Sequence, residues 1–346
     1  MTTVADGLYQ FGGMPVTGGI PPLFGKDAKA FFVDPVNGSD GNPGDAPQRA
    51  FASLYRAHYM MTAGRNDVCF LLGNGATSGT ARLSLANAIA AQGPSETPAT
   101  SGELVWSKDA CHLIGIAAPG MNSRARIATP TGTYTAATFG SNNMMTVSAD
   151  GCYIANISLT QSFSTGNAAE ITLTVSGERN VFSNVFSSGG LSAAAYGGAA
   201  SRALLLTAGE NDFYGCEIGA DTVTRSAANA NLGITTAAAR NKFTKCVFSM
   251  YTSSATSVFV LVGVGGVDRW TLFDDCMFIN AMDSGSTAIT GAFSLAASAG
   301  GSMVVKNSGL VGDGAANWGI DATSLAQMYV DNVGGAATAG LMLNPT

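Results

Sequence analysis

Charged side chains are scarce in this sequence. Asp, Glu, Lys and Arg make up 12% of the 346 residues, and the formal net charge is −6 at pH 7. No cluster of Lys and Arg occurs, so binding of nucleic acid through neutralised phosphates is excluded. No apolar run approaches the length of a transmembrane helix. We therefore expect no membrane partner, and the start at Met1 also lacks the basic and apolar regions of a secretory signal peptide.

Histidine and closely spaced cysteine pairs are scarce too. The two histidines are His58 and His112, and none of the six cysteines forms a Cys-x-x-Cys pair. This pattern predicts no zinc site, and we expect no other metal and no cofactor. Cys216, Cys246 and Cys276 recur at one position of a repeat. We expect them to be small buried residues with free thiols, in a chain made in a reducing cytoplasm.

The feature that the sequence does contain is a repeat. An apolar anchor is followed by two mostly polar residues and then by a small apolar partner. The anchors are Ile154, Phe182, Phe213, Phe243, Phe273, Val305 and Val330, and subtraction gives gaps of 28, 31, 30, 30, 32 and 25 residues. The partners are Ile157, Val185, Cys216, Cys246, Cys276, Ser308 and Val333. Three units share an asparagine two places before the anchor, namely Asn180, Asn211 and Asn241.

The spacing and composition of the repeat predict an all-β solenoid. Runs of four to six β-forming residues, such as 258–262, alternate with stretches of Ala, Ser, Thr and Gly. Helical repeats would need ten or more residues with a 3.6-residue period. One coil for each repeat describes a single-stranded parallel β-helix in which the anchors form an internal column. The three-residue step from anchor to partner predicts a bend between two short strands, with the polar residues at the bend.

The chain divides into two expected parts. Residues 1–30 combine Gly and Pro with aromatic side chains and predict an extended N-terminal arm, which docks on another subunit or scaffold or folds back on its own domain. Residues 31–346 form the β-helix domain, with regular coils from about 150 to 335. Within it, 47–63 is expected to be a helix that caps the open end of the solenoid. Strands are expected at 68–72, 103–106, 111–116 and 124–127, and a short helix at 81–91.

One turn-rich stretch has the superficial composition of a calcium loop. It contains Asp34, Asn37, Asp40 and Asn42, but it lacks the glutamate that closes an EF-hand loop. The Asn-Gly, Asp-Gly and Pro-Gly pairs instead predict a structural turn.

Several segments resemble a known family. Phe32-Val33-Asp34-Pro35, Asn37-Gly38-Ser39-Asp40 and Phe51-Ala52-Ser53-Leu54 look like the opening of pectin-lyase-like parallel β-helix proteins, particularly the virion-associated members from tailed bacteriophages. The stretches 106–110 and 112–119 match in the same way, and the resemblance covers about 31–128. It implies a right-handed parallel β-helix, commonly trimeric in phage particles. Its motifs belong to turns and a cap, so they indicate the fold much more strongly than any chemical activity.

No set of residues in the sequence makes a convincing active site. Asp274-Asp275 is the strongest candidate for paired carboxylates, but it falls at the polar bend of the repeat. The acidic and basic candidates for a lyase site are Glu217, Asp221, Asp274, Asp275, Asp283 and Arg269, and they form no dense acidic face. The aromatics outside the internal columns, which could contact sugar, are Tyr196, Tyr214, Tyr251 and Trp318. We therefore expect no catalytic, cofactor-binding or metal residues.

Three functions remain open at this point. The first is a structural bacteriophage virion protein: a homotrimeric capsid decoration protein of the head-fibre or cement type. It would be assembled in the host cytoplasm and attached through its N-terminal region to the major capsid protein or another virion protein. The second is a tail spike or tail fibre that binds or depolymerises surface glycans. The third is a free polysaccharide lyase or hydrolase, which the missing signal peptide and motifs disfavour.

Overall fold

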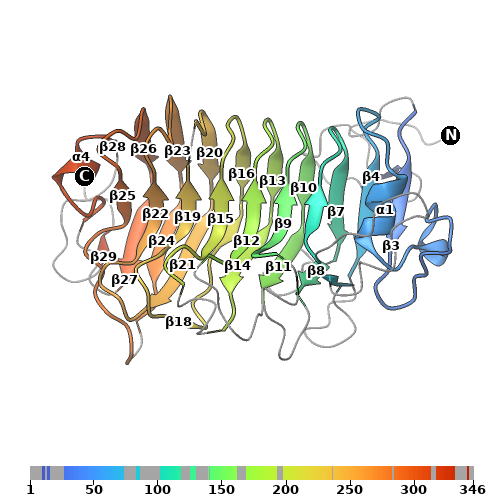
Figure 1. Cartoon of the computed structure of the whole chain (residues 1–346), viewed down its shortest axis with the longest axis horizontal. Helices are drawn as coiled ribbons and strands as arrows, with labels where there is room; N and C mark the ends of the chain where they lie inside the picture. The colour runs from blue at the N-terminus through green and yellow to red at the C-terminus, as the bar shows by residue number, and fades with distance from the viewer. Residues whose placement is uncertain are drawn as a thin grey trace.

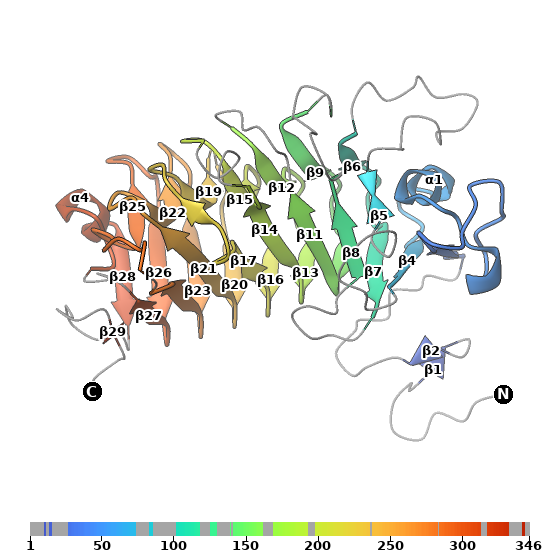
Figure 2. The same cartoon turned by 90° about the horizontal axis from the view of Figure 1, so that it is seen from below.

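The computed structural model is a right-handed parallel β-helix whose coils stack along one long axis (Figures 1 and 2). It describes residues 10–11, 14–15, 27–73, 83–85, 102–117, 125–129, 139, 141–161, 169–192, 198–235, 237–282, 284–312, 317–331 and 341–342. Three sheets, here called I, II and III, run the length of the solenoid, and each coil contributes one strand to each sheet in its regular part. No helix in these ranges is long and apolar enough to cross a membrane.

Sheet I holds the strands that carry the anchors. In chain order they are β3 (Ala30–Val33), β4 (Val68–Leu72), β7 (His112–Ile116), β10 (Tyr153–Ala155), β13 (Val181–Ser183), β16 (Asp212–Tyr214), β20 (Asn241–Thr244), β23 (Trp270–Asp274), β26 (Ser302–Lys306) and β28 (Met328–Asp331).

Sheets II and III complete each coil. Sheet II contains β5 (Leu83–Ser84), β8 (Ala125–Ala128), β11 (Ile157–Gln161), β14 (Phe186–Gly190), β17 (Glu217–Ile218), β21 (Val247–Thr252), β24 (Met277–Asn280), β27 (Gly309–Gly312) and β29 (Leu341–Met342), while β18 (Thr224–Arg225) pairs with β21. Sheet III contains β6 (Leu104–Trp106), β9 (Asn143–Val147), β12 (Ile171–Val175), β15 (Arg202–Leu206), β19 (Ala230–Ile234), β22 (Val258–Val262) and β25 (Phe293–Leu295).

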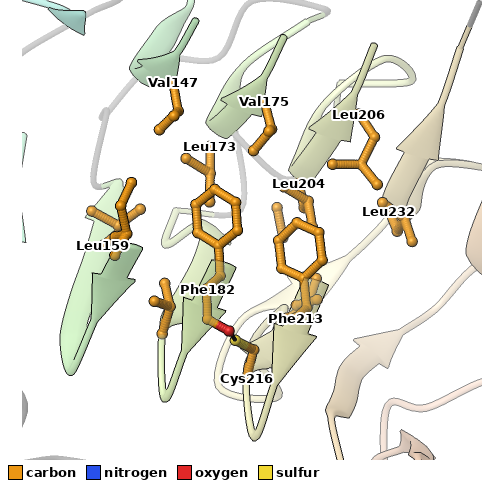
Figure 3. Packing of buried hydrophobic residues seen from close by; sticks show 14 of the residues in the cluster. Val147, Leu159, Leu173, Val175, Phe182, Leu204, Leu206, Phe213, Cys216 and Leu232 are labelled. Carbon is orange, nitrogen blue, oxygen red and sulfur yellow. Dashed lines mark hydrogen bonds between the residues drawn. The ribbon is translucent and has the colours of Figure 1, made fainter. Parts of the chain in front are cut away.

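The anchors form one internal column, as the repeat predicts. Each anchor from Ile154 to Val330 is the register partner of the next one across sheet I. The four phenylalanine rings of this column are nearly parallel, with centroids 4.6, 4.6 and 4.8 Å apart. Leucine and valine columns from sheet III face them across the interior (Figure 3). Because each coil supplies a like side chain at the spacing of hydrogen-bonded strands, the core is continuous along the axis.

The repeated asparagines form a ladder inside the turn that precedes sheet I. The Oδ1 atoms of Asn180, Asn211 and Asn241 accept hydrogen bonds from the backbone N–H one coil earlier, of Cys152, Asn180 and Asn211 respectively, at 2.7, 3.0 and 3.0 Å. Their Nδ2 atoms donate to backbone carbonyls of the turns, and all three side chains are buried. The ladder thus gives hydrogen-bond partners to backbone N–H and C=O groups of the turns that do not pair with a neighbouring strand.

The predicted bend between anchor and partner is confirmed. One residue with positive φ separates sheet I from sheet II in the coils whose bend the structure describes, and its equivalents are Asn156, Asn184, Gly215, Lys245, Asp275 and Asn307. The last predicted partner, Val333, lies outside the described residues. A single left-handed residue reverses the inward and outward alternation, so the anchor and its partner both point inwards. The partner thiols are buried and free. Cys216, Cys246 and Cys276 each donate to the carbonyl of the anchor one coil earlier, at 3.4–3.5 Å.

The expected cap helix over 47–63 is wrong in its extent. A 3₁₀ turn, η1, covers Pro47–Arg49, and the helix α1 covers only Leu54–Met60. The residues between them are extended because Phe51 donates to the Phe32 carbonyl and accepts from the Asp34 N–H. Ser53 then caps the start of α1 by accepting from the Arg56 N–H. Helix α1 packs on β3, β4 and β6 at the N-terminal end (Figure 1).

Lys108 links the C-terminal end of α1 to the following coil through hydrogen bonds. Its Nζ atom donates to the carbonyls of His58, Tyr59 and Met61 at 2.7–2.8 Å. These carbonyls lie in the last turn and at the C-cap of α1, where a cation is stabilised by unpaired backbone acceptors. The segment 106–110, which is part of the family resemblance, therefore joins α1 to the solenoid through Lys108.

The coils before residue 150 are longer than the later ones. The interior residues Phe31, Cys69, Leu113 and Ile154 are successive register partners, and subtraction gives gaps of 38, 44 and 41 residues. The strands expected at 68–72, 103–106, 111–116 and 124–127 are confirmed with small shifts in their bounds. The short helix expected at 81–91 is wrong at Leu83–Ser84, which is strand β5; most of that stretch lies outside the described residues.

The C-terminal end is closed by local structure. Trp318 is buried with its ring edge-on to Phe278, and the short helix α4 (Ala322–Leu325) packs on β25 and β28. Strand β29 pairs antiparallel with β27, the last parallel strand of sheet II. Of the expected N-terminal arm, the structure describes only the two-residue strands β1 (Gln10–Phe11) and β2 (Met14–Pro15), which pair antiparallel, and residues 27–30.

Candidate functional site

The adjacent aspartates of the sequence do not face one another as a catalytic pair. Thr244 is the register partner of Asp274, and Asp275 takes the left-handed bend position with a φ of 56°. Asp274 points outwards from sheet I, where its Oδ1 accepts from the Asn307 side chain at 3.1 Å. Asp275 is exposed on the turn. The prediction that this pair belongs to a polar bend is confirmed.

The remaining acidic candidates lie on different faces. Glu217 is half-buried on the outer face of sheet II, while Asp221 and Arg269 are exposed on turns. Asp283 lies outside the described residues. No group of three or more His, Cys, Asp or Glu side chains that could hold a metal occurs among the residues that the structure describes.

The turn-rich stretch after β3 uses its carboxylates to hold the backbone. Asp34 Oδ1 accepts from the N–H groups of Val36 and Asn37 at 2.9 and 3.1 Å. Asp40 accepts from the N–H groups of Ala52 and Ser53 through Oδ1, both at 2.9 Å, and from the Ser53 hydroxyl through Oδ2. Two or three donors to each carboxylate make this a structural turn, as the sequence predicts.

Both histidines belong to the first coils and accept backbone hydrogen bonds. His58 Nε2 accepts from the Ser107 N–H at 3.2 Å, and its ring packs on Trp106 at 4.8 Å. His112 Nδ1 accepts from the Tyr153 N–H at 3.0 Å. The pKa of each imidazole is lowered to about 4, mainly by burial. The charge of Lys108 contributes to the lowering at His58, and Asp67 opposes it at His112. These histidines are held neutral and serve the packing of the N-terminal end.

We expect the stability of the N-terminal coils to fall between pH 6.5 and 4. The unfolded histidines bind protons near pH 6.5, whereas the folded ones resist protonation down to about pH 4. The two histidines therefore leave the free energy of unfolding unchanged above pH 6.5. As the pH falls from 6.5 to 4, each of them lowers it by about 1–3 kcal/mol, because only the unfolded chain binds the proton. Denaturant unfolding at several pH values measures it. The combined variant His58→Gln and His112→Asn should flatten this dependence, and an unchanged slope would contradict the prediction.

A buried arginine lies at the corner between sheets II and III. Arg225 has 1% exposure, and its guanidinium donates to Asn231 Oδ1. Asn231 in turn donates to the carbonyls of Ile218 and Ser249 at 2.8 and 2.7 Å. The β18 backbone at Arg225 also pairs with β21. Arg225 thus belongs to a polar network that ties the loop after β17 to the neighbouring coils.

The outer face of sheet II is apolar over its last long strands. The outward positions of β21, β24 and β27 are Val247, Ser249, Tyr251, Met277, Ile279, Gly309 and Val311, and none is charged. Most of these side chains are half-buried by their neighbours in the same columns. We call this surface the apolar face. A flat sheet surface without charge is suited to burial against another protein surface.

The outer face of sheet I carries exposed aromatic rings near the C-terminal end. Trp270 and Tyr329 have exposures of 39% and 66%, and Leu272 and Val304 lie between them. We call these four residues the aromatic patch. Its rim holds Lys242, Thr244, Asp274 and Lys306 on the neighbouring outward positions, and the Arg240–Glu210 ion pair lies beside it. Exposed rings with a charged rim suit contact with a flat amphipathic ligand.

The four aromatics singled out in the sequence have different environments. Tyr214 is 49% exposed on sheet I, two strands before the aromatic patch. Tyr251 is half-buried on the apolar face, and Trp318 is buried in the core. Tyr196 lies outside the described residues. Sequence reasoning missed Trp270 and Tyr329, although alternation along β23 and β28 places both on outward positions.

Comparison with known proteins supports the class that the coil geometry defines, a pectin-lyase-like right-handed parallel β-helix. No protein family and no curated protein matches the sequence significantly. Among solved structures, pectin methylesterase from Aspergillus niger aligns with a TM-score of 0.53 at 14% identity, over 92% of this chain and 89% of that one.

Two further structures are similar to the same extent. Pectin methylesterase PemA from Erwinia chrysanthemi gives a TM-score of 0.52 at 13% identity, covering 93% of this chain and 94% of that chain. Pectate lyase Pel9A gives 0.51 at 12% identity, covering 84% of this chain and 67% of that chain. At such identities the likeness establishes the fold and leaves the activity open.

Proposed function

We propose that this chain is a structural protein of a tailed bacteriophage particle, a homotrimer that decorates the capsid. The observation that carries the proposal is the uncharged apolar face on β21, β24 and β27. The sequence resemblance over 31–128 to virion-associated β-helix proteins supports the same reading. Attachment to the major capsid protein or another virion protein would use the N-terminal region, which leaves the far end of the solenoid projecting from the particle.

The apolar face supplies a contact that a trimer could bury. Met277 lies beside Val247 on one side and Gly309 on the other, and Ile279 lies beside Ser249 and Val311. The outer face of sheet I at the same level carries Lys242, Asp274 and Lys306 instead. Burial of unpaired charges costs several kcal/mol each. Association through the apolar face is therefore favoured over association through sheet I.

We expect charge on the apolar face to dissociate the trimer. The combined variant Met277→Lys and Ile279→Lys would place two unpaired ammonium groups in the contact, which should convert trimer to monomer at micromolar concentration. Light scattering after size exclusion measures the mass. The matched control is Leu272→Lys with Val304→Lys, at half-buried outward positions of sheet I, and it should remain trimeric. A monomeric wild-type protein, or a trimer that persists in the first variant, would contradict the proposed assembly.

The position in the particle is tested by cryo-electron microscopy of intact virions. Trimers on the capsid lattice, with density from the N-terminal region between capsid subunits, are the expected result. Density at the tail tip would overturn the capsid assignment and favour the second function.

The aromatic patch favours a second candidate function, binding of a surface polysaccharide by a tail spike or fibre. Among the similar structures are a pectate lyase and pectin methylesterases, one of which was solved with a bound hexasaccharide. On this chain, Trp270 and Tyr329 would stack on sugar rings, while the rim side chains would hydrogen-bond to hydroxyl or carboxylate groups.

We expect the variant Trp270→Ala to weaken binding of purified host surface polysaccharide by about tenfold or more if this second function holds. Isothermal titration of the intact protein measures the affinity, and Val264→Ala, at a turn residue with 75% exposure, is the control. Release of oligosaccharides by the wild-type protein would show depolymerisation, and its loss in Asp274→Asn or Asp275→Asn would assign a part in the reaction to that carboxylate. An absence of binding by the wild-type protein would dismiss the glycan function.

A further inference from the structure

The outer face of sheet III carries no charge along its central column. Its seven strands, from β6 to β25, each place one outward residue in register with that of the next strand. The neighbours of these residues in each strand belong to the interior core, so their own side chains point outwards. The column, which we call the second face, consists of Val105, Thr146, Thr174, Leu205, Gly233, Leu261 and Ser294.

One charged side chain reaches the second face. Arg202 begins β15 and extends towards Gly233, where its Nε atom would lie 3.2 Å from a Cβ atom added to that glycine. Its Nη1 atom donates to the carbonyls of Ala199 and Ser201 at 3.0 and 2.7 Å. The guanidinium is thus already hydrogen-bonded, and arginine is a residue type that protein interfaces favour. Arg202 therefore does not oppose burial of this surface as an unpaired charge would.

The charged residues of the regular coils lie mainly on the other side of the solenoid. Those on the corner from sheet III to sheet I are Glu178, Arg179, Glu210, Arg240, Asp268 and Arg269, and those that point outwards from sheet I are Asp212, Lys242, Asp274 and Lys306. The corner from sheet II to sheet III, over 219–229, 253–257 and 281–292, has Asp221 and the buried Arg225, while its Asp283 lies outside the described residues. The apolar face and the second face are therefore joined by a corner of lower charge.

The corner between the apolar face and the second face exposes a methionine. Met282 follows β24 and has an exposure of 72%. Strand β24 supplies Met277 and Ile279 to the apolar face, so Met282 continues the same apolar surface around the corner. Burial of such a side chain contributes about 1.5–3 kcal/mol. The similarly exposed Val264, at 75%, lies instead on the corner from sheet III to sheet I, four residues before Asp268.

We propose that the apolar face of one copy packs against the second face of a neighbouring copy, with the corner at Met282 closest to the threefold axis. The inference rests on the homotrimer of the proposed function and names the two surfaces that meet in it. A closed ring of three copies has contacts between unlike surfaces, so each copy must present two different ones. The apolar face is one of them. The second face is the other, because its column is uncharged and continues the apolar face around the corner.

Sheet I is unsuited to be the surface that meets the apolar face. Its outward residues Lys242, Asp274 and Lys306 would lose contact with water on burial, at a cost of several kcal/mol for each charge left unpaired. With sheets II and III inside the trimer, sheet I faces the solvent. The aromatic patch then stays accessible to a ligand in the assembled protein.

Chemical cross-linking tests which faces meet. We would introduce Ile279→Cys on the apolar face and Leu261→Cys on the second face, each alone and together, and treat the proteins with a short bismaleimide; the six native thiols are buried and give a low background. The double variant should form covalent dimers and trimers, whereas each single variant should stay monomeric under denaturing conditions. A second pair, Met277→Cys with Leu205→Cys, allows for a shift between the copies along the solenoid axis. Cross-linked dimers of a single variant, or no cross-link with either pair, would overturn the proposal.

Charge on the second face provides an independent test. Leu205→Lys with Leu261→Lys, at half-buried outward positions, should convert trimer to monomer. Met282→Lys should weaken association by about tenfold or more, because three ammonium groups would meet near the axis, while the control Val264→Lys should remain trimeric. Light scattering after size exclusion measures the mass, and circular dichroism checks that each variant is folded. If the lysine variants at Leu205, Leu261 and Met282 all stay trimeric, the second face is wrong although the trimer of the proposed function stands; a monomeric wild-type protein would refute the trimer itself.

Discussion

Replacing Phe243 by alanine is expected to lower the free energy of unfolding by about 3–5 kcal/mol. Its ring lies between those of Phe213 and Phe273, at 4.6 and 4.8 Å, and it meets Phe248 edge-on at 5.6 Å. Alanine would leave a cavity in the middle of the stack, and the neighbouring rings cannot close it because hydrogen-bonded strands hold their spacing. Denaturant unfolding of the purified protein measures the effect.

The controls for Phe243→Ala separate packing from residue type. Phe243→Leu keeps much of the volume and should cost about 1–2 kcal/mol. Tyr214→Ala removes a ring of similar size from the outer face of the same sheet, where half the side chain is exposed, and should change stability by about 0.5 kcal/mol. A cost for Phe243→Ala no larger than that for Tyr214→Ala would show that the stack adds little to stability.

The second large effect is expected from Asn211→Ala, at about 3–5 kcal/mol. The Asn211 side chain is 1% exposed and lies in the middle of the ladder. Its Oδ1 accepts from the Asn180 N–H at 3.0 Å, and its Nδ2 donates to the carbonyls of Gly177 and Gly209 at 3.1 and 3.0 Å. Alanine would leave these backbone groups buried without partners. The same unfolding measurement tests it.

The variant Asn211→Asp distinguishes hydrogen bonding from shape. Aspartate has nearly the size of asparagine, but above its pKa it directs a second oxygen at the carbonyls that accept from Nδ2. It should therefore be at least as damaging as alanine at pH 7. Ser183→Ala, half-buried on the outer face of sheet I, should be close to neutral. If Asn211→Asp had the same free energy of unfolding as the wild-type protein, the asparagines would contribute to stability through their shape and not through their hydrogen bonds.

The regular part of the fold could be predicted from the sequence because each coil places one like residue at one position. The recurrence of the anchors and of the asparagines and the presence of a bend follow from that repetition, and the register of the anchors is confirmed from Ile154 to Val330. The left-handed conformation of the bend residue is a finding of the structure. The first coils could not be predicted in the same way. Their interior partners lie 38–44 residues apart by subtraction, and the inserted loops hide the period.

The extent of the N-terminal helix was missed for a related reason. Phe51, Leu54, Tyr55 and His58 have helical spacing, yet Phe51 is bound to β3 through backbone hydrogen bonds before the helix begins. Asp40, thirteen residues away, holds Ser53 in the extended conformation that starts the helix. Such tertiary contacts override local periodicity and cannot be read from spacing alone.

The amino-acid sequence by itself determined the solenoid, because a side chain repeated once in each coil can satisfy its packing only by stacking on its equivalents. Only the tertiary structure decided which outward residues share a surface. Trp270 and Tyr329 are far apart in sequence but lie two strands apart on sheet I, and the uncharged positions of sheet II align only after the coils have stacked. The physical reason is that outward positions need no common residue type, so their pattern carries no period in the sequence.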